Sequence, residues 1–358
     1  MEPKKQESKL VLEDGSVFHG YSFGSKKAVA GEVVFNTGMV GYPESLTDPS
    51  YKGQILVLTY PLIGNYGVPG YQKEDGLLKY FESDKIQVQG LIIADYSDEY
   101  SHWNAKKSLS DWMKEHDIPG IYGIDTRELT KKLRQKGTLL GKIVYNNEKI
   151  TYENPNKRNL VAEVSINKPV VYKKGKKRVV IVDCGVKNNI IRAFLRRNFT
   201  VTRVPWDYNF LNEKVDSIII SNGPGDPKKC TKTIENVRKV MNKNIPILGI
   251  CLGSQILGLA AGARTYKLKY GHRSHNQPCI DVGTNRCYIT TQNHGYAIDS
   301  KTLPEDWREW FVNNNDGTNE GIIHISKPFF GAQFHPEASP GPDDTEFIFD
   351  MFVRAMKK

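Results

Sequence analysis

The sequence has few cysteines, and they are not arranged as a metal or disulfide motif. The five cysteines are an odd number and include no C-x-x-C pair, which argues against a disulfide framework and a zinc site. No apolar run is long enough to span a membrane, and residues 1–9 lack the apolar core of a signal peptide. The same residues contain Glu2 and Glu7 but no arginine, unlike a transit peptide. We therefore expect a cytoplasmic protein with no membrane segment.

The sequence also lacks a nucleic-acid-binding module, although its formal net charge is +10. Such a charge is compatible with nucleic acid or an acidic partner. The lysines are scattered, however, apart from one dense run over residues 173–178. We interpret that run as part of a solvated basic linker, and we expect no nucleic-acid partner. The length of 358 residues is enough for two domains with separate cores.

The first 150 residues mix strand and helix signals without a regular βαβ alternation, which indicates an N-terminal α+β domain over residues 1–150. Asp14-Gly15 lies between two β-rich runs and predicts a hairpin. Ser108 and Asp125 are candidate N-caps of two helices. Other strand candidates are residues 32–35, 54–59 and 88–94. Residues 151–177 are polar and basic, and we expect an interdomain linker there with a short packed segment at 160–164.

From residue 178 onward, short apolar runs alternate with helical segments. This alternation predicts an α/β fold with a doubly wound, mainly parallel sheet over residues 178–358. The expected strands are residues 179–183, 200–205, 216–221, 245–250, 286–291, 321–325 and 329–334. The expected helices are residues 188–197, 231–242 and 343–356, with another helix directly after Cys251.

Cys251 lies between Gly249 and Gly253 in the pattern G-x-C-x-G. This is the cysteine form of the nucleophile elbow G-x-S-x-G, in which a tight strand-to-helix turn exposes the nucleophile. Glycines allow the strand and helix to approach closely, and the helix N-terminus favours thiolate over thiol. We interpret Cys251 as a candidate nucleophile; a buried structural cysteine is the alternative.

A cysteine nucleophile needs a base and a group that orients the base. The segment His335-Pro336-Glu337 follows the last expected strand. Side chains two residues apart in an extended segment lie on the same side, so Glu337 can orient the His335 ring while its other nitrogen faces Cys251. Alone, the pattern H-P-E is weak and also typical of a strand-end turn. Its combination with the elbow is more specific.

Acyl transfer also needs preorganised N–H groups that bind the oxyanion. Gly223 and Gly225 lie in a loop that follows the strand expected beside the elbow strand. The N–H of either glycine, together with that of Leu252, would form an oxyanion hole. A simple Pro-Gly turn is the alternative interpretation of this loop.

These three motifs, in this order, resemble those of the class I (triad) glutamine amidotransferases. The resemblance narrows to the small, glutaminase subunit of carbamoyl-phosphate synthetase, and most to the eukaryotic pyrimidine-pathway form, where this unit begins a longer fused polypeptide. It covers nearly the whole chain and includes an N-terminal domain that other amidotransferases of this class lack. The further matching stretches are residues 38–51, 59–67, 123–127, 276–278 and 292–296.

The resemblance implies a mechanism. Cys251 would attack the side-chain amide of L-glutamine, giving a thioester and ammonia, with His335 as base and acid and Glu337 orienting it. The ammonia would pass to the synthetase partner, which docks on the N-terminal domain and makes carbamoyl phosphate for pyrimidine or arginine biosynthesis. Glutamine would be bound by Ser50, Gly223, Gly225, Leu252, Gln255, Asn293, Gly295 and Tyr296.

The family pattern and this sequence differ at one position beside the nucleophile. Ser254 stands where histidine is common in the family, so the coupling or the basal glutaminase rate could differ. Cys251 is retained, whereas the ureotelic mitochondrial relatives have lost it, which favours a working glutaminase. The chain has no G-x-x-x-x-G-K-[ST] loop, so ATP and metal are expected only on the synthetase and no cofactor in this chain.

Three alternatives remain open: a non-catalytic docking subunit, another amidotransferase of the class, and a papain-like protease, which would ignore free glutamine. Whether the chain is a separate subunit or part of a fused one also stays open. His272 and His275 form an H-x-x-H pattern, but without a third ligand we expect surface structure and no metal site. The role of His294 is left open. The other cysteines, expected in the core or in loops, are Cys184, Cys230, Cys279 and Cys287.

Overall fold

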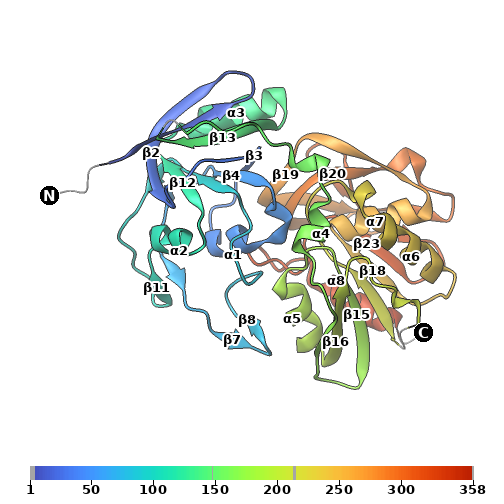
Figure 1. The fold of residues 1–358 in the computed structure, drawn as a ribbon. Coiled ribbons are helices and arrows are strands. Elements are labelled where there is room, and N and C mark those ends of the chain that lie inside the picture. Colours follow the sequence, from blue (N-terminus) through green and yellow to red (C-terminus); the bar gives the residue numbers. More distant parts are fainter. Residues whose placement is uncertain (1–4, 147, 213–214, 357–358) are drawn as a thin grey trace. The chain divides into compact units, whose positions relative to one another are not determined.

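A computed structural model of the chain divides into two compact units (Figure 1). The first comprises Met1–Lys73 and Leu78–Arg158, and the second comprises Glu74–Leu77 and Asn159–Lys358. The structure describes residues 5–146, 148–212 and 215–356, so the first four residues of the expected N-terminal domain lie outside it.

The first unit is built on a closed barrel of seven strands, an architecture that the mixed strand and helix signals did not reveal. The predicted hairpin is present, because the first two strands pair antiparallel around the turn at Asp14-Gly15. Parallel pairs in the middle of the barrel are possible because helices and loops cross between them. In order around the barrel, the strands are β1 (Glu7–Leu12), β13 (Leu139–Tyr145), β3 (Val29–Asn36), β4 (Gln54–Leu58), β9 (Gly90–Ile92), β12 (Pro119–Tyr122) and β2 (Val17–Gly24).

Three helices accompany the barrel. The N-caps of the second and third are the predicted ones: Ser108 Oγ accepts a hydrogen bond from the Asp111 N–H, and Asp125 Oδ1 accepts one from the Glu128 N–H. These helices are α1 (Tyr42–Thr47), α2 (Leu109–Glu115) and α3 (Thr126–Lys136).

Short strands that form two-stranded sheets apart from the barrel are β5 (Leu62–Ile63), β6 (Val68–Pro69), β7 (Lys73–Glu74), β8 (Leu77–Leu78), β10 (Asp95–Tyr96) and β11 (Ala105–Lys107).

The second unit contains a ten-stranded sheet whose central strands are parallel, as the alternation of runs and helices predicts. The remaining strands are antiparallel. In sheet order the strands are β14 (Val170–Tyr172), β16 (Phe199–Pro205), β15 (Lys177–Asp183), β17 (Ser217–Ile220), β18 (Ile247–Ile250), β23 (Phe329–Ala332), β22 (Asn319–His324), β21 (Trp307–Asn313), β19 (Arg264–Asp281) and β20 (Cys287–Asp299).

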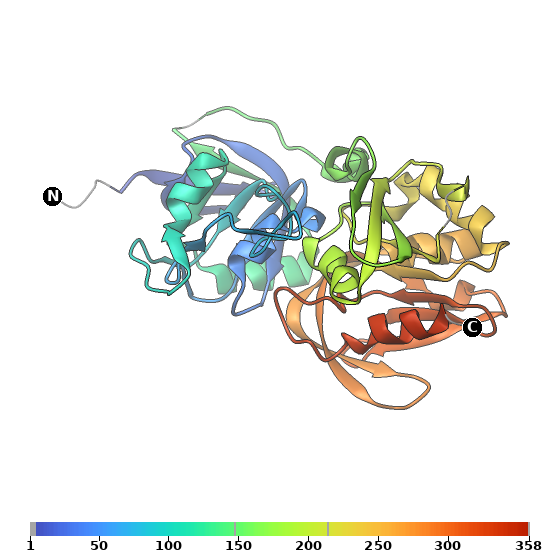
Figure 2. The same ribbon diagram turned by 90° about the horizontal axis from the view of Figure 1, so that it is seen from below.

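Helices cover both faces of the parallel part of this sheet (Figure 2). Each face carries its own apolar cluster. Ile190 and Phe194 of α5 (Asn188–Arg196) pack with Phe349 of α8 (Phe347–Ala355) on one face. Val237 of α6 (Thr231–Met241) and Ile256 of α7 (Leu252–Ala261) pack on the other. The doubly wound prediction is therefore confirmed.

The short packed segment expected at 160–164 is present as α4 (Leu160–Val164), whose Val161 joins an apolar cluster of the second unit. Two other features were not expected. Part of the stretch expected as a linker forms β14, which pairs with β16 in the sheet. The long strand β19 was not predicted, since its residues are polar over much of their length and carry no simple alternation. None of the helices among the described residues has the length and apolar character needed to cross a membrane.

Candidate active site

The predicted motifs lie at one edge of the second unit's sheet, where its parallel strands end. The segments that follow the carboxyl ends of β15, β17, β18 and β23 are residues 184–187, 221–225, 251 and 333–337, respectively. These four strands are consecutive neighbours in the sheet. Open α/β sheets bind ligands at this edge, because loops from adjacent strands meet there.

Cys251 forms the predicted elbow between β18 and α7. Its backbone has φ 54° and ψ −107°, a conformation that costs a residue with a side chain about 1–3 kcal/mol. Its N–H donates to Ala332 O at 2.8 Å, which fixes the turn against β23. A Cβ on Gly249 would lie 2.4 Å from Gly253 O, and one on Gly253 would lie 2.0 Å from Ile220 O. Both glycines of the motif are therefore required by packing.

His335 and Glu337 interact directly, with 2.7 Å between Nδ1 and Oε1. The segment is a turn rather than the extended strand end that the prediction assumed, and the Ala338 N–H donates to His335 O across it. The turn nevertheless brings the two side chains together. The opposite ring nitrogen, Nε2, is then available for exchange of a proton with the thiol.

Lys187 completes this buried array, and the sequence analysis missed it. Its Nζ lies 3.1 Å from Glu337 Oε1 and donates to Ala338 O, and the side chain is 2% exposed. Lys187 is the N-cap residue of α5 and follows β15, so its position after a parallel strand was the signal that could have identified it. A lysine is usually solvent-exposed, which is why composition and spacing alone did not select it.

The electrostatics of the array favour an imidazolium beside an ionised carboxyl group. Burial alone would lower the pKa of His335, but Glu337 and the nearby Cys251 raise it. Burial would raise the pKa of Glu337, but Lys187 and His335 hold it below its ordinary value. A protonated His335 next to the thiol stabilises a thiolate nucleophile.

The Cys251 thiol is surrounded by polar groups of β20 and of the segment after β23. Its Sγ lies 3.6 Å from Asn293 O and 3.7 Å from Gln333 Nε2. Gln333 Oε1 accepts a hydrogen bond from Gln255 Nε2, which also donates to Tyr296 O. Gln333 is the second residue that the sequence analysis missed; its place two residues before His335 gave no chemical signal of its own.

The loop after β17 has the close packing expected of a backbone binding loop. A Cβ on Gly223 would lie 2.0 Å from Cys184 O, and Gly225 has φ 84°, which favours glycine. Leu252 is the first residue of α7, so its N–H is among those without an intrahelical acceptor. The predicted oxyanion hole combines the N–H of Leu252 with that of Gly223 or Gly225, and that role stays a prediction.

The residues predicted to bind glutamine fall in both units. Gly223, Gly225, Leu252 and Gln255 lie on the loop after β17 and on α7, while Asn293, Gly295 and Tyr296 lie on β20. Ser50 lies in the first unit, in the short 3-10 helix Pro49–Tyr51, where its N–H donates to Asp48 Oδ1 at 2.9 Å.

Ser254, the departure from the family pattern, is fully buried on α7. Its Oγ has no hydrogen-bond partner among the described residues, and a Cβ on Gly331 would lie 2.6 Å from it. The side chain therefore packs against β23, beneath the elbow, where a larger residue would displace the strand.

The expectation of surface structure at the H-x-x-H segment is wrong for its first histidine. His272 lies in β19 and is buried, with its ring against that of His294 and between Glu320 and Asp316. The other cysteines are free thiols in the structure; Cys184, Cys230 and Cys279 are buried and Cys287 is exposed.

Two family descriptions match successive parts of the chain. Residues 10–143 match "Carbamoyl-phosphate synthase small chain, CPSase domain", and residues 180–355 match "Glutamine amidotransferase class-I". The first range corresponds to the barrel unit and the second to the unit that contains Cys251.

Similar full-length proteins are much longer than this chain. "Multifunctional protein pyr1-3" of Dictyostelium discoideum is 54% identical over 96% of this chain, "Multifunctional protein CAD" of Squalus acanthias is 55% identical over 97%, and "Carbamoyl-phosphate synthase [ammonia], mitochondrial" of Homo sapiens is 52% identical over 99%. The chain spans 17%, 16% and 24% of these proteins, respectively.

Proposed function

The chain belongs to the carbamoyl-phosphate synthase small-chain family with a class-I glutamine amidotransferase domain, and we propose from this premise that it is the glutaminase component of a carbamoyl-phosphate synthase. It hydrolyses L-glutamine to glutamate and ammonia. The observation that carries the proposal is the buried array in which Lys187, Glu337 and His335 accompany a cysteine on a nucleophile elbow.

The reaction starts with attack of the Cys251 thiolate on the side-chain amide carbon of glutamine, which forms a C–S bond. The N–H groups of Leu252 and of Gly223 or Gly225 stabilise the negative oxygen of the tetrahedral intermediate. His335 donates its Nε2 proton to the amide nitrogen as the C–N bond breaks, so ammonia leaves.

Hydrolysis of the thioester reverses the proton transfer. His335, now neutral, accepts a proton from water as the water oxygen attacks the thioester carbon, and Cys251 leaves as the thiolate. Glu337 keeps the ring oriented through Nδ1 in both steps. The chemistry uses these side chains alone, and we propose that this step needs no cofactor in this chain.

The partner that consumes the ammonia is the synthetase part of the same enzyme, either fused to this chain or separate from it. The similarity to long multifunctional proteins supports the fused arrangement and a role in pyrimidine biosynthesis, with arginine biosynthesis as the alternative pathway. We place the reaction in the cytoplasm. The seven predicted residues of the second unit bind the glutamine, and the contribution of Ser50 stays a prediction.

The test is glutamate release from glutamine by the purified chain, with and without a synthetase partner. Release that is lost in Cys251→Ser and rises with the partner supports the proposal. A folded chain that releases no glutamate even with its partner contradicts it and leaves a docking subunit. Cleavage of peptides with no activity on free glutamine would instead indicate a protease.

A further inference from the structure

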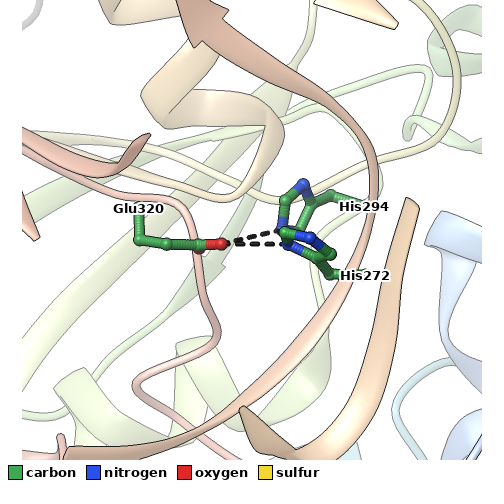
Figure 3. A group of neighbouring side chains, drawn as sticks. All are labelled: His272, His294 and Glu320. Carbon is green, nitrogen blue, oxygen red and sulfur yellow. Dashed lines mark hydrogen bonds and ion pairs between the residues drawn. The ribbon is translucent and has the colours of Figure 1, made fainter. Parts of the chain in front are cut away.

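A second group of ionisable side chains lies within the antiparallel part of the second unit's sheet. His272 of β19, His294 of β20 and Glu320 of β22 converge there, and all three are buried (Figure 3). Glu320 Oε1 lies 3.0 Å from His272 Nδ1 and 3.7 Å from His294 Nε2. One potential ligand atom from each residue lies within 4.8 Å of the others.

The outer nitrogen of each ring faces an acceptor. His272 Nε2 lies 2.9 Å from Asp316 Oδ2, and His294 Nδ1 lies 2.8 Å from Tyr296 O. A neutral imidazole that donates its outer N–H to such an acceptor has its lone pair on the inner nitrogen. Metal-binding histidines are typically oriented in this way, by a carboxylate or a backbone carbonyl on the far side of the ring.

The inner side of the group is rich in acceptors and poor in donors. With both outer nitrogens protonated, two nitrogen lone pairs face the same carboxylate oxygen, Glu320 Oε1. Asn313 Nδ2 donates to that oxygen at 3.2 Å, while Glu320 Oε2 is buried and has no hydrogen-bond partner among the described residues. A buried carboxylate surrounded by lone pairs needs a compensating positive charge.

We propose that His272, His294 and Glu320 bind one divalent transition-metal ion, with zinc the best match to this donor set. Two imidazoles and a carboxylate are common zinc ligands, at about 2.0–2.2 Å, so neighbouring donors lie about 3.3 Å apart in a tetrahedral site. The observed separations of 3.0 Å and 3.7 Å bracket that spacing. Gln292 Oε1, 3.2 Å from His294 Nε2, lies where a fourth donor would be needed.

Charge balance supports a divalent ion. Glu320 and Asp316 contribute two negative charges to the group, and two neutral histidines contribute none. One divalent cation neutralises them. The ion would link β19, β20 and β22, so its role is structural, and it takes no part in the glutamine chemistry proposed above.

A proton is the competing cation. Burial opposes it, but Asp316 and Glu320 raise the pKa of His272 to about 9, so a protonated His272 could pair with both carboxylates and no metal would bind. The two states differ in metal content, and a direct measurement separates them.

The experiment uses the full chain, treated with a chelator, dialysed, and then titrated with Zn²⁺ or Co²⁺. We expect one tightly bound ion per chain, a rise in Tm with Zn²⁺, and a Co²⁺ spectrum with d–d bands but no thiolate charge-transfer band. His272→Asn should lose the ion. Two controls should keep it. His324→Gln alters a buried histidine outside the group, whose Nε2 pairs with the exposed Asp306 and whose Nδ1 accepts from the Ser326 and Lys327 N–H groups, and Cys251→Ser removes the reactive thiol.

Failure of the chelator-treated chain to bind either ion would overturn the proposal in favour of the protonated pair, even if no variant were made. Retention of the ion by a folded His272→Asn chain, or its loss in Cys251→Ser, would also overturn it, since the ion would then lie elsewhere. None of these outcomes depends on glutaminase activity, so failure of this proposal and failure of the glutaminase proposal are distinguishable.

Discussion

Two buried glutamates among the described residues of the second unit, Glu337 and Glu320, each pair with a histidine, and their surroundings give the two pairs opposite electrostatic character. Glu337 and Glu320 both have side chains with no exposed surface, and each lies within 3.0 Å of an imidazole Nδ1. The additional charged partner differs. It is Lys187 beside Glu337, whereas His272 has a second carboxylate, Asp316, on its other side.

This difference decides what each histidine can do. Lys187 already balances Glu337, so a proton on His335 is balanced by the Cys251 thiolate, and a neutral His335 leaves no unpaired charge. His272 instead pairs with two carboxylates, Glu320 and Asp316, so the ring must share a proton or an external cation with them. We therefore expect the same pair of residue types to exchange a proton in one place and to require a cation in the other.

The largest expected effect is that of His335→Asn, which removes the base and acid but preserves much of the volume. We expect glutamate release to fall by about 10³-fold, within the range for loss of a general acid–base group. His272→Asn should reduce kcat far less. Steady-state kinetics of both variants measure the two losses of kcat. Similar losses would contradict the difference in role between His335 and His272.

Glu320→Gln should instead mainly affect folding. Removing one partner of a buried ion pair costs about 3 kcal/mol, because the protonated His272 of the metal-free chain loses one of the two carboxylates that pair with it. Urea unfolding of the chelator-treated chain measures this difference in the free energy of unfolding. A change below about 1 kcal/mol would show that Glu320 adds little net stability, contrary to the expectation.

Lys187→Met should change the pH dependence of the glutaminase. Glu337 must stay ionised to orient His335, and Lys187 lowers its pKa, so activity in the unmodified chain persists until the pH falls through that low value. Without Lys187 the pKa rises, and the acid limb of the kcat profile should move to higher pH. Without the ion pair to Lys187, Glu337 is held less firmly and orients the His335 ring less well. We therefore expect kcat near neutral pH to fall by about ten- to a hundredfold. An acid limb at the same pH as in the unmodified chain would contradict this role.

Asp306→Asn should have the smallest effect. Asp306 pairs with the buried His324 at 3.1 Å, but its side chain is 60% exposed, so water screens the interaction. The free energy of unfolding should change by less than about 1 kcal/mol. A larger loss in thermal or urea unfolding would show that exposure is a poor guide to the strength of these pairs.

Much of the second unit could be predicted from local sequence. The runs that became β15, β17 and β18 are continuous and apolar because both faces of the sheet are covered, and such runs are visible without a structure. The elbow at Cys251 and the pair His335–Glu337 were also visible, since their spacing is only a few residues. The closed barrel was not, because closure depends on pairings such as β1 with β13, which are far apart in the chain.

The same reasoning explains what was missed at the sites. Lys187 and Glu337 are separated by 150 positions, and His272 and Glu320 by 48, so no local pattern connects them. Only the order of strands in the sheet brings them together. Of the two histidines in the H-x-x-H pattern, only His272 belongs to the proposed metal site. Its partners there come from two other strands, β20 and β22, and His275 is not among them.

The backbone of Cys251 has a consequence for how the protein would respond to selection. Its positive φ costs the fold about 1–3 kcal/mol, and glycine would remove that cost. A Cys251→Gly chain should therefore be inactive yet melt at a higher temperature. Laboratory evolution that selects for thermal stability alone should therefore favour replacement of Cys251. A variant that is both thermostable and active must gain its stability from substitutions at other positions.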